Sequence, residues 1–138
     1  MSITDTIGYR QNNPLNMRPL GGGQLWHGQS GSSNGFCVFL DPRWCFRAWL
    51  MEAHSYRSTW NCKTVMDYIR HYAPPEDDND PTAYTQAVEK YMGLAPNEPF
   101  DLDARALDFC KGQMMVEIGG VPYSDSLIKQ GFSWVGNR

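Results

Sequence analysis

The sequence lacks a block of basic residues. Its 138 residues include 12 Lys and Arg against 15 Asp and Glu, which gives a formal net charge of −3. Because phosphate binding needs clustered Lys and Arg, nucleic acid is not expected as a partner. No apolar run reaches the roughly 20 residues of a membrane span. The opening "MSITDTIGYR" also lacks the basic-then-apolar order of a signal peptide, so we expect another agent to carry the protein to any target outside the cytoplasm.

Metal-binding patterns are missing as well. The cysteines form no C-x-x-C pair, the three histidines are scattered, and no EF-hand pattern is present. Zinc and calcium sites need ligands at short, regular spacings, so no metal and no cofactor is predicted. Cys45 and Cys110 fall on apolar stripes and are expected in the core. The spacing neither assigns nor excludes a disulfide.

The composition is that of a folded domain. Hydrophobic residues make up 41% and aromatic residues 13% of the chain, which has no repeat and no low-complexity tract. A chain of this length can bury one core. We therefore predict a single domain over residues 1–138, with residues 1–7 as a candidate flexible arm.

Helical periodicity and capping residues predict five helices. Acceptor side chains stand where the helices should begin, and glycine or proline follows where they should end. The expected spans are about 42–57, 65–72, 81–92, 103–118 and 125–130. A β-hairpin is expected where "QLWHGQ" and "FCVFL" flank the turn "SGSSNG". The predicted fold class is thus mainly α (α+β), with about five helices and one small hairpin.

Glu117 is the acid whose position suggests chemistry. It lies at the edge of a stripe formed by Leu107, Cys110, Met114 and Ile118, in the last turn of a helix that ends at a Gly-Gly pair. Partial burial and the helix C-terminus both disfavour a negative charge, so its pKa should be raised. A general acid needs a raised pKa to act near neutral pH. The alternative is a surface Glu that ends a helix.

Other polar residues have two interpretations each. Glu52 shares a helix face with Ala48 and Ala53, either as a second site acid or as an ion-paired side chain that reaches solvent. The Asn cluster near position 13 suits turns, although amides can also line a sugar site. Trp26 on the hairpin could pack in the core or stack on a sugar.

Four segments together resemble a known family. They are "GYRQNNPLNMR", "FLDPRWCFRA", "YAPPEDDNDPTAYTQAV" and "VEIGGVPYSDSLIKQGF", which run in this order from Gly8 to Phe132. The same ordered motifs occur in phage virion proteins similar to the lytic virion enzyme of enveloped double-stranded RNA phages. That family is related to goose-type lysozymes and lytic transglycosylases.

The resemblance implies a lysozyme-like fold and degradation of peptidoglycan. It implies that Glu117 is the catalytic acid and that Tyr84 faces the scissile sugar. The implied substrate-binding positions, with Trp26 added as a candidate stacking residue, are Asn12, Asn13, Asn16, Tyr123, Ser124, Asp125 and Trp26. The chain departs from the family pattern at Leu15, Cys45 and Val116. Leu15 and Cys45 would be expected to reshape the rim of the cleft.

The function expected from these motifs is a virion-associated peptidoglycan-degrading enzyme. It would be carried by the particle, would act in the host periplasm and cell wall, and would have bacterial peptidoglycan and other virion proteins as partners. One acid without a clear partner favours lytic transglycosylase-like cleavage over two-acid hydrolysis. The alternatives are a non-catalytic virion subunit on the same fold, a peptidoglycan endopeptidase, or a bacterial wall-remodelling protein.

Overall fold

The computed structural model describes residues 2–77 and 79–136, and the prediction of a mainly helical chain with a small hairpin is confirmed. Met1 of the expected arm and residue 78 of the acidic loop lie outside the described residues. The elements are α1 (Ile7–Arg10), β1 (Gln29–Ser33), β2 (Phe36–Phe39), α2 (Pro42–Trp60), α3 (Val65–Tyr72), α4 (Pro81–Met92), α5 (Leu102–Ile118) and α6 (Asp125–Ser133). Short 3-10 turns occur at η1 (Ile3–Asp5), η2 (Pro75–Asp77) and η3 (Trp134–Gly136).

The five expected helices begin within one residue of the expected positions. In each, a side-chain oxygen accepts a backbone N–H of the first turn; these caps are Asp41, Thr64, Asp80, Asp101 and Ser124. Gly93 and Gly119 close α4 and α5 in the left-handed conformation. The expected end of α2 at Arg57 is three residues short, because the left-handed residue that stops the helix is Asn61, with φ 55°.

The first strand of the hairpin was expected at residues 24–29, and this prediction is wrong. The strand β1 begins only at Gln29 and pairs antiparallel with β2. Asn34 and Gly35 have φ of 58° and 81° and form a two-residue turn between the paired Ser33 and Phe36. Positive φ at both central residues is the geometry of a tight hairpin turn, so the strand must end directly before Asn34.

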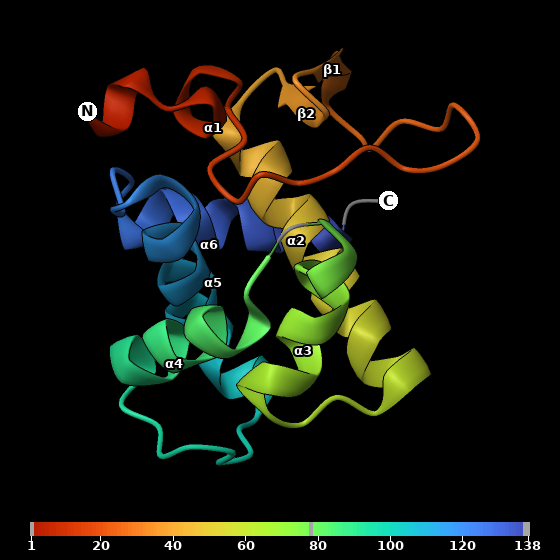
Figure 1. Cartoon of the computed structure of the whole chain (residues 1–138). Helices are drawn as coiled ribbons and strands as arrows, with labels where there is room; N and C mark the ends of the chain where they lie inside the picture. Colours follow the sequence, from red (N-terminus) through yellow and green to blue (C-terminus); the bar gives the residue numbers. More distant parts are fainter. Residues whose placement is uncertain (1, 78, 137–138) are drawn as a thin grey trace.

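The N-terminal segment is more regular than the sequence indicates. Residues 3–5 form η1, and Thr6 caps the four-residue helix α1, which the periodicity had not predicted. The same segment then returns through an Asn-rich loop that lies beside the hairpin, in the upper part of Figure 1.

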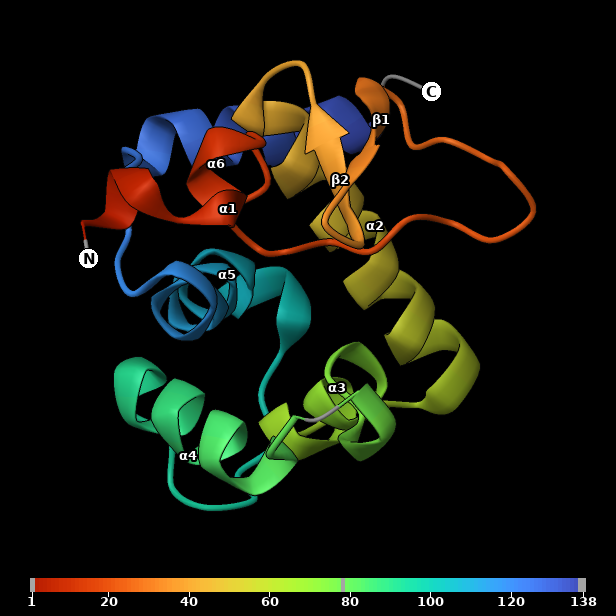
Figure 2. The ribbon, with the colours of Figure 1, turned by 45° about the horizontal axis from the view of Figure 1, so that its top comes forward.

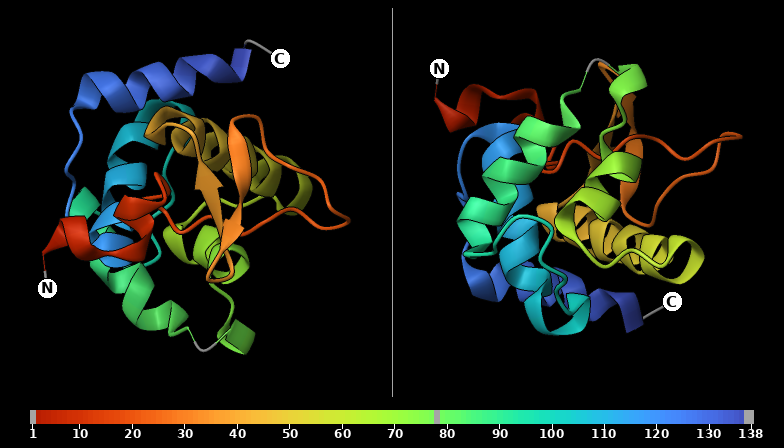
Figure 3. Two further views of the ribbon diagram at one scale, coloured as in Figure 1. Left: turned by 90° about the horizontal axis from the view of Figure 1, so that it is seen from above. Right: turned by 60° about the horizontal axis from the view of Figure 1, so that its bottom comes forward.

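Helix α5 lies at the centre of the arrangement. It packs against α4 on one side and contacts α1, α2 and α6 on others. Figure 2 shows the N-terminal segment and hairpin above, α3 and α4 below, and α2 running between the two levels. The C-terminal helix α6 packs against α2, and the left view of Figure 3 shows it at the top beside the beginning of α2. The N-terminal loop and the end of α5 also meet, although 101 positions separate Asn16 from Glu117.

The core is aromatic and closely packed. Trp49 meets Phe109 edge-on at 5.4 Å between ring centroids, and Tyr68 meets Phe109 at 5.2 Å. Cys45 and Cys110 are fully buried, as predicted, and all four cysteines are free thiols. Among the described residues, none of the helices combines the length with the apolar composition that a membrane span requires. The same residues contain no group of three His, Cys, Asp or Glu arranged to hold a metal ion.

Candidate active site

Three segments meet at the Glu117 carboxylate. The Tyr84 hydroxyl, from α4, donates a hydrogen bond of 2.7 Å to Oε2, and the Asn16 amide, from the N-terminal loop, donates one of 2.8 Å to Oε1. Gly119 ends α5 two residues later with φ 82°, which fixes the position of this last helical turn. The structure thus brings together three of the residues predicted from sequence, on elements far apart in the chain.

The environment of Glu117 favours its protonated form. Burial raises the pKa of the carboxyl above its ordinary value of 4.5, while the hydrogen bonds from Tyr84 and Asn16 and the charge of Arg18 offset part of the rise. The predicted direction of the pKa shift is confirmed, and its main cause is desolvation. Each carboxylate oxygen accepts one hydrogen bond, which leaves a lone pair on each for a proton.

A buried chain of hydrogen bonds orients the Tyr84 proton. The Trp49 indole donates to Gln113 Oε1 at 2.8 Å, and Gln113 Nε2 donates to the Tyr84 hydroxyl oxygen at 3.2 Å. An indole N–H can only donate, so Gln113 must turn its carbonyl to Trp49 and its amide to Tyr84. The Tyr84 oxygen already accepts a hydrogen bond from Gln113, so its own hydrogen is directed to Glu117.

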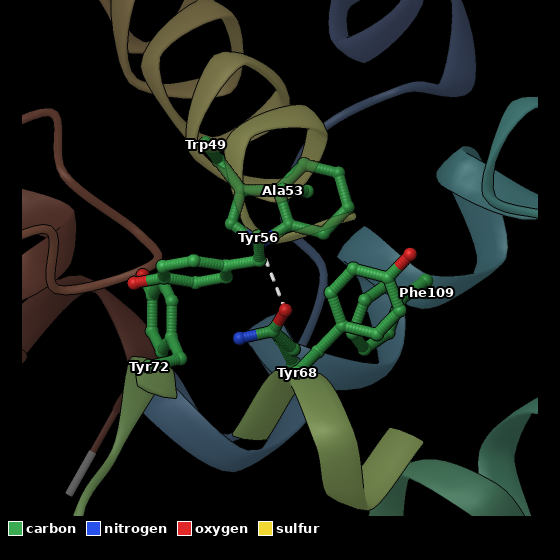
Figure 4. Close-up of a pocket in the computed structure, with 7 residues that line it drawn as sticks. Trp49, Ala53, Tyr56, Tyr68, Tyr72 and Phe109 are labelled. Atoms are coloured by element: carbon green, nitrogen blue, oxygen red, sulfur yellow. Dashed lines mark hydrogen bonds between the residues drawn. The ribbon is translucent and has the colours of Figure 1, made fainter. Parts of the chain in front are cut away.

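Figure 4 shows the aromatic surroundings of this chain, with the bond from Trp49 drawn as the dashed line. The space between Trp49, Ala53, Tyr68 and Phe109 has no room for a water molecule. Burial also raises the pKa of Tyr84 far above its usual value, so the hydroxyl remains neutral and keeps its proton. Tyr84 is therefore a permanent donor to the carboxylate.

The Asn-rich loop holds Asn16 beside Glu117. Asn12 and Asn16 adopt left-handed φ of 52° and 50°, which Asn tolerates better than most residues. Asn13 is fully buried, and its amide is bonded to Met17 and to the backbone of Cys37, so it supports the loop from inside and is not open to a ligand. Gly8 allows the close approach, because a Cβ there would lie 2.8 Å from Asn16 Oδ1.

Glu117 borders two hollows in the surface. The first, which we call the Thr6 recess, has a volume of about 290 Å³ and is also lined by Gly8, Asn16 and Phe36. The second, the Asn79 recess, measures about 60 Å³.

A third hollow, the Glu52 recess, measures about 130 Å³ and shares Asn16, Arg18 and Tyr72 with the Asn79 recess. The Thr6 recess shares Asn16, Phe36 and Glu117 with the Asn79 recess, so the Asn79 recess adjoins both of the others. Glu117 lies between the first two.

The other predicted binding residues lie away from Glu117. Ser124 caps α6, Asp125 pairs with Lys111 at 2.9 Å, and Tyr123 stacks on Tyr9 at 6.1 Å between centroids. Asn12 donates its amide to the backbone of Phe39. Trp26 packs against the core, and its indole N–H is buried without a hydrogen-bond partner. None of these five lines the three recesses.

Leu15 and Cys45 do not reshape the rim of the site. Both are fully buried, and neither lines a recess. The backbone carbonyl of Leu15 accepts a hydrogen bond from the Tyr72 hydroxyl, and the Cys45 thiol donates to Asn13 Oδ1 at 3.4 Å. These departures from the family pattern are accommodated in the core beneath the loop.

Sequence reasoning missed Arg18, Tyr72 and Gln113. Gln113 had a signal, because it is a polar residue four positions before Glu117 on the same helix. Arg18 closes the motif that contains the Asn cluster, yet its sequence position does not show that it borders the acid. In the sequence, Tyr72 is one apolar-stripe residue of a helix among others. Only tertiary packing places it in a recess next to Glu117.

The site is thus a half-buried carboxylate that accepts two hydrogen bonds and lies between surface hollows of a mainly helical chain. The chain is similar to a bacteriophage protein. That relative is Protein P5 of Pseudoalteromonas phage PM2, which is 28% identical over 130 residues. The match covers 92% of this chain and 80% of Protein P5. Comparison with models of known protein families finds no match.

Proposed function

We propose that this chain is a virion-associated enzyme that cleaves the glycan strand of bacterial peptidoglycan, with Glu117 as its single catalytic acid. The observation that carries the proposal is the Glu117 carboxyl itself: its pKa is raised by burial, Tyr84 and Asn16 hold its two oxygens, and two recesses open onto it. Similarity to a phage protein supports delivery by the particle to the host periplasm and cell wall, with other virion proteins as partners.

The proposed reaction uses one carboxyl group in two steps. Protonated Glu117 gives its proton to the glycosidic oxygen as the bond to the sugar carbon breaks. The resulting carboxylate then takes the proton of the sugar's own 6-hydroxyl, whose oxygen closes a 1,6-anhydro ring on the same carbon. An intramolecular nucleophile is already held close to the reacting carbon, so no second carboxylate has to activate water.

Tyr84 and Asn16 act as positioning residues in this scheme. Their donors fix the plane of the carboxyl group and lower the cost of its ionised form after proton transfer. The recesses on either side of Glu117 are not filled by Leu15 or Trp26, which favours an enzyme over a purely structural subunit on the same fold.

The test is Glu117→Gln, assayed on outer-membrane-permeabilised cells. The variant keeps the shape of the side chain and removes the proton donor, so activity should fall by about 100-fold or more while the folded structure is retained. Glu98→Gln is the matched control, because it removes the same charge from the exposed connector before α5. A Glu117→Gln protein with full activity and an unchanged melting curve would refute the assignment.

A further inference from the structure

Two side chains donate to the Glu117 carboxylate, and they come from different levels of the fold. Tyr84 lies on α4, where packing against α5 holds it in place. Asn16 lies in the N-terminal loop, part of the segment that Figure 2 shows above α3 and α4. A loop side chain stays on an acid of another element only if the backbone beside it is fixed. The contacts of the neighbouring loop residues therefore decide whether Asn16 keeps its place.

Tyr72, the last residue of α3, supplies such a contact. Its hydroxyl donates a hydrogen bond to the backbone carbonyl of Leu15, and the Met17 thioether lies 3.4 Å from the same oxygen. Figure 4 shows this hydroxyl directed at the N-terminal loop. Burial raises the pKa of Tyr72 far above its ordinary value, so the hydroxyl keeps its proton and remains a donor to the loop.

The Leu15 carbonyl is directly coupled to the position of Asn16. This carbonyl and the Asn16 backbone nitrogen belong to one peptide group, which is planar. A hydrogen bond that holds the Leu15 oxygen therefore also fixes the direction of the Asn16 N–Cα bond. Beyond Asn16 the loop is held again, because the Asn13 side chain bonds to both the N–H and the C=O of Met17. Tyr72 thus fixes the peptide from which the Asn16 side chain leaves toward Glu117.

The helix behind Tyr72 is firmly packed. Val65 and Ile69 of α3 are fully buried, and the helix packs against α2 and α4. Tyr72 also lines the Asn79 recess together with Asn16 and Glu117. Its hydroxyl therefore ties the loop to a fixed element at the wall of the hollow that contains the acid.

We propose that Tyr72 is a positioning residue for the acid: its hydroxyl holds the Leu15 peptide so that the Asn16 amide stays bonded to Glu117. Tyr72 acts through Asn16 in this role. It is neutral, so removing its hydroxyl changes no charge near the carboxyl group. The effect on turnover rests on the proposed function, whereas the effect on the carboxyl group can be measured without any substrate.

The first test is an NMR titration of Glu117 in protein with isotope-labelled glutamate, with the signal assigned by its absence in Glu117→Gln. Tyr72→Phe removes only the hydroxyl. Asn16→Gly removes the amide, and glycine adopts the φ of 50° without strain. Because the ionised carboxylate loses a donor, each change should raise the pKa of Glu117. The double variant should show no larger shift than Asn16→Gly alone, since both changes remove one contact.

Tyr56→Phe is the matched control. It removes a hydroxyl from another ring of the Glu52 recess, one that bonds to Glu52, so the pKa of Glu117 should stay as in the wild type. A Tyr72→Phe protein that titrates like this control would overturn the proposal, and so would shifts that add in the double variant. A Tyr72→Phe protein that is unfolded where Tyr56→Phe is folded would also overturn it, because the hydroxyl would then support the whole fold.

Turnover of purified peptidoglycan gives the second test. The kcat should fall about 10-fold in Tyr72→Phe and in Asn16→Gly and no further in the double variant, while Tyr56→Phe keeps the wild-type kcat. A lower kcat in Tyr72→Phe with an unchanged Glu117 titration would give Tyr72 another role and overturn the proposal. If the wild type itself cleaves no peptidoglycan, the proposed function fails alone, and the titration still decides the role of Tyr72.

Discussion

The neighbours of Tyr84 determine which hydrogen bond its hydroxyl donates and which it accepts. Gln113 Nε2 donates a hydrogen bond of 3.2 Å to its oxygen, and its hydroxyl donates one of 2.7 Å to Glu117 Oε2. A Tyr84→Phe variant keeps the ring in the helix packing but leaves Glu117 with one fewer donor. It also leaves the Gln113 amide without its partner, which costs stability.

For Tyr84→Phe we expect a larger loss of rate than of stability. The rate should fall about 100-fold, which is about 2.7 kcal/mol, because the carboxyl is no longer held in one orientation. The free energy of unfolding should fall by about 1 to 2 kcal/mol, the usual cost of an unsatisfied buried donor. Turnover and chemical denaturation of the same preparation measure both. Losses of equal size, expressed in free energy, would assign the hydroxyl a purely structural role.

Glu117 should also make stability depend on pH in a predictable direction. Its pKa is higher in the folded chain than the ordinary 4.5, so the folded state binds this proton more tightly. Its contribution is therefore fully present at low pH and is lost as pH rises through the raised pKa.

The melting temperature of Glu117→Gln, minus that of the wild type, should accordingly increase between about pH 4 and pH 8. The Gln amide group cannot accept hydrogen bonds from both donors, which lowers the melting temperature of the variant by a similar amount at every pH. The change of the melting-temperature difference with pH is therefore the quantity that tests the prediction. Thermal melts of both proteins across this range measure it. A difference that stays constant, or that falls with pH, would mean that the carboxyl is not destabilised by burial.

Single residues were predictable from sequence where local physics decides them. The raised pKa of Glu117 followed from its stripe and its helix end. The sequence did not distinguish the members of the Asn cluster. Asn16 bonds to Glu117, Asn13 is bonded inside the loop, and Asn12 bonds to the backbone of Phe39. Three neighbouring residues of one type were separated only by the path of the backbone.

At the scale of elements, the end of α5 controls where Glu117 lies. Gly119 has φ 82°, and nothing lies within 4 Å of the position its Cβ would take. An added methyl group would therefore meet no neighbour, and the whole cost of Gly119→Ala comes from the left-handed backbone. The same substitution at Gly31 also meets nothing but has no positive φ, which makes it a matched control.

We expect Gly119→Ala to lower the free energy of unfolding by about 1 kcal/mol and Gly31→Ala to change it by less than about 0.5 kcal/mol. Activity should fall in the first variant only, because the strain is placed in the turn that carries the acid. Urea denaturation and a lysis assay of both variants test this. Equal effects at the two positions would mean that the helix end is not under conformational control by glycine.

Helices were predictable as elements because their caps are local. The position of β1 could not be predicted in this way. The segment "QLWHGQ" has the apolar content of a strand, but the Asn34-Gly35 turn sets the pairing with β2 and so places the strand directly before it. Helix α1 was missed for a related reason. Four residues are too few to show periodicity, and the helix is held by its Thr6 cap and its contact with α5.

Across the whole molecule, the fold joins segments that the sequence keeps apart. The bond between Asn16 and Glu117 spans 101 positions, and the bond between Tyr84 and Glu117 spans 33. Motif resemblance suggested that these residues act together, but it did not distinguish them from Tyr123, Ser124 and Asp125, which lie elsewhere. The recesses that adjoin Glu117 depend on how α3, the hairpin, the N-terminal segment and the end of α5 pack, which no local pattern contains.

The most direct measurement of the central claim is mass spectrometry of the products released from purified peptidoglycan. If Glu117 acts alone, the liberated sugars end in a 1,6-anhydro ring, and Glu117→Gln releases none of them. Glu52→Gln should yield the same anhydro products, because one carboxyl group is enough for this reaction. Reducing-end products together with an inactive Glu52→Gln variant would instead identify a two-acid hydrolase, and release of peptides from intact glycan would identify an endopeptidase; either result would contradict the account.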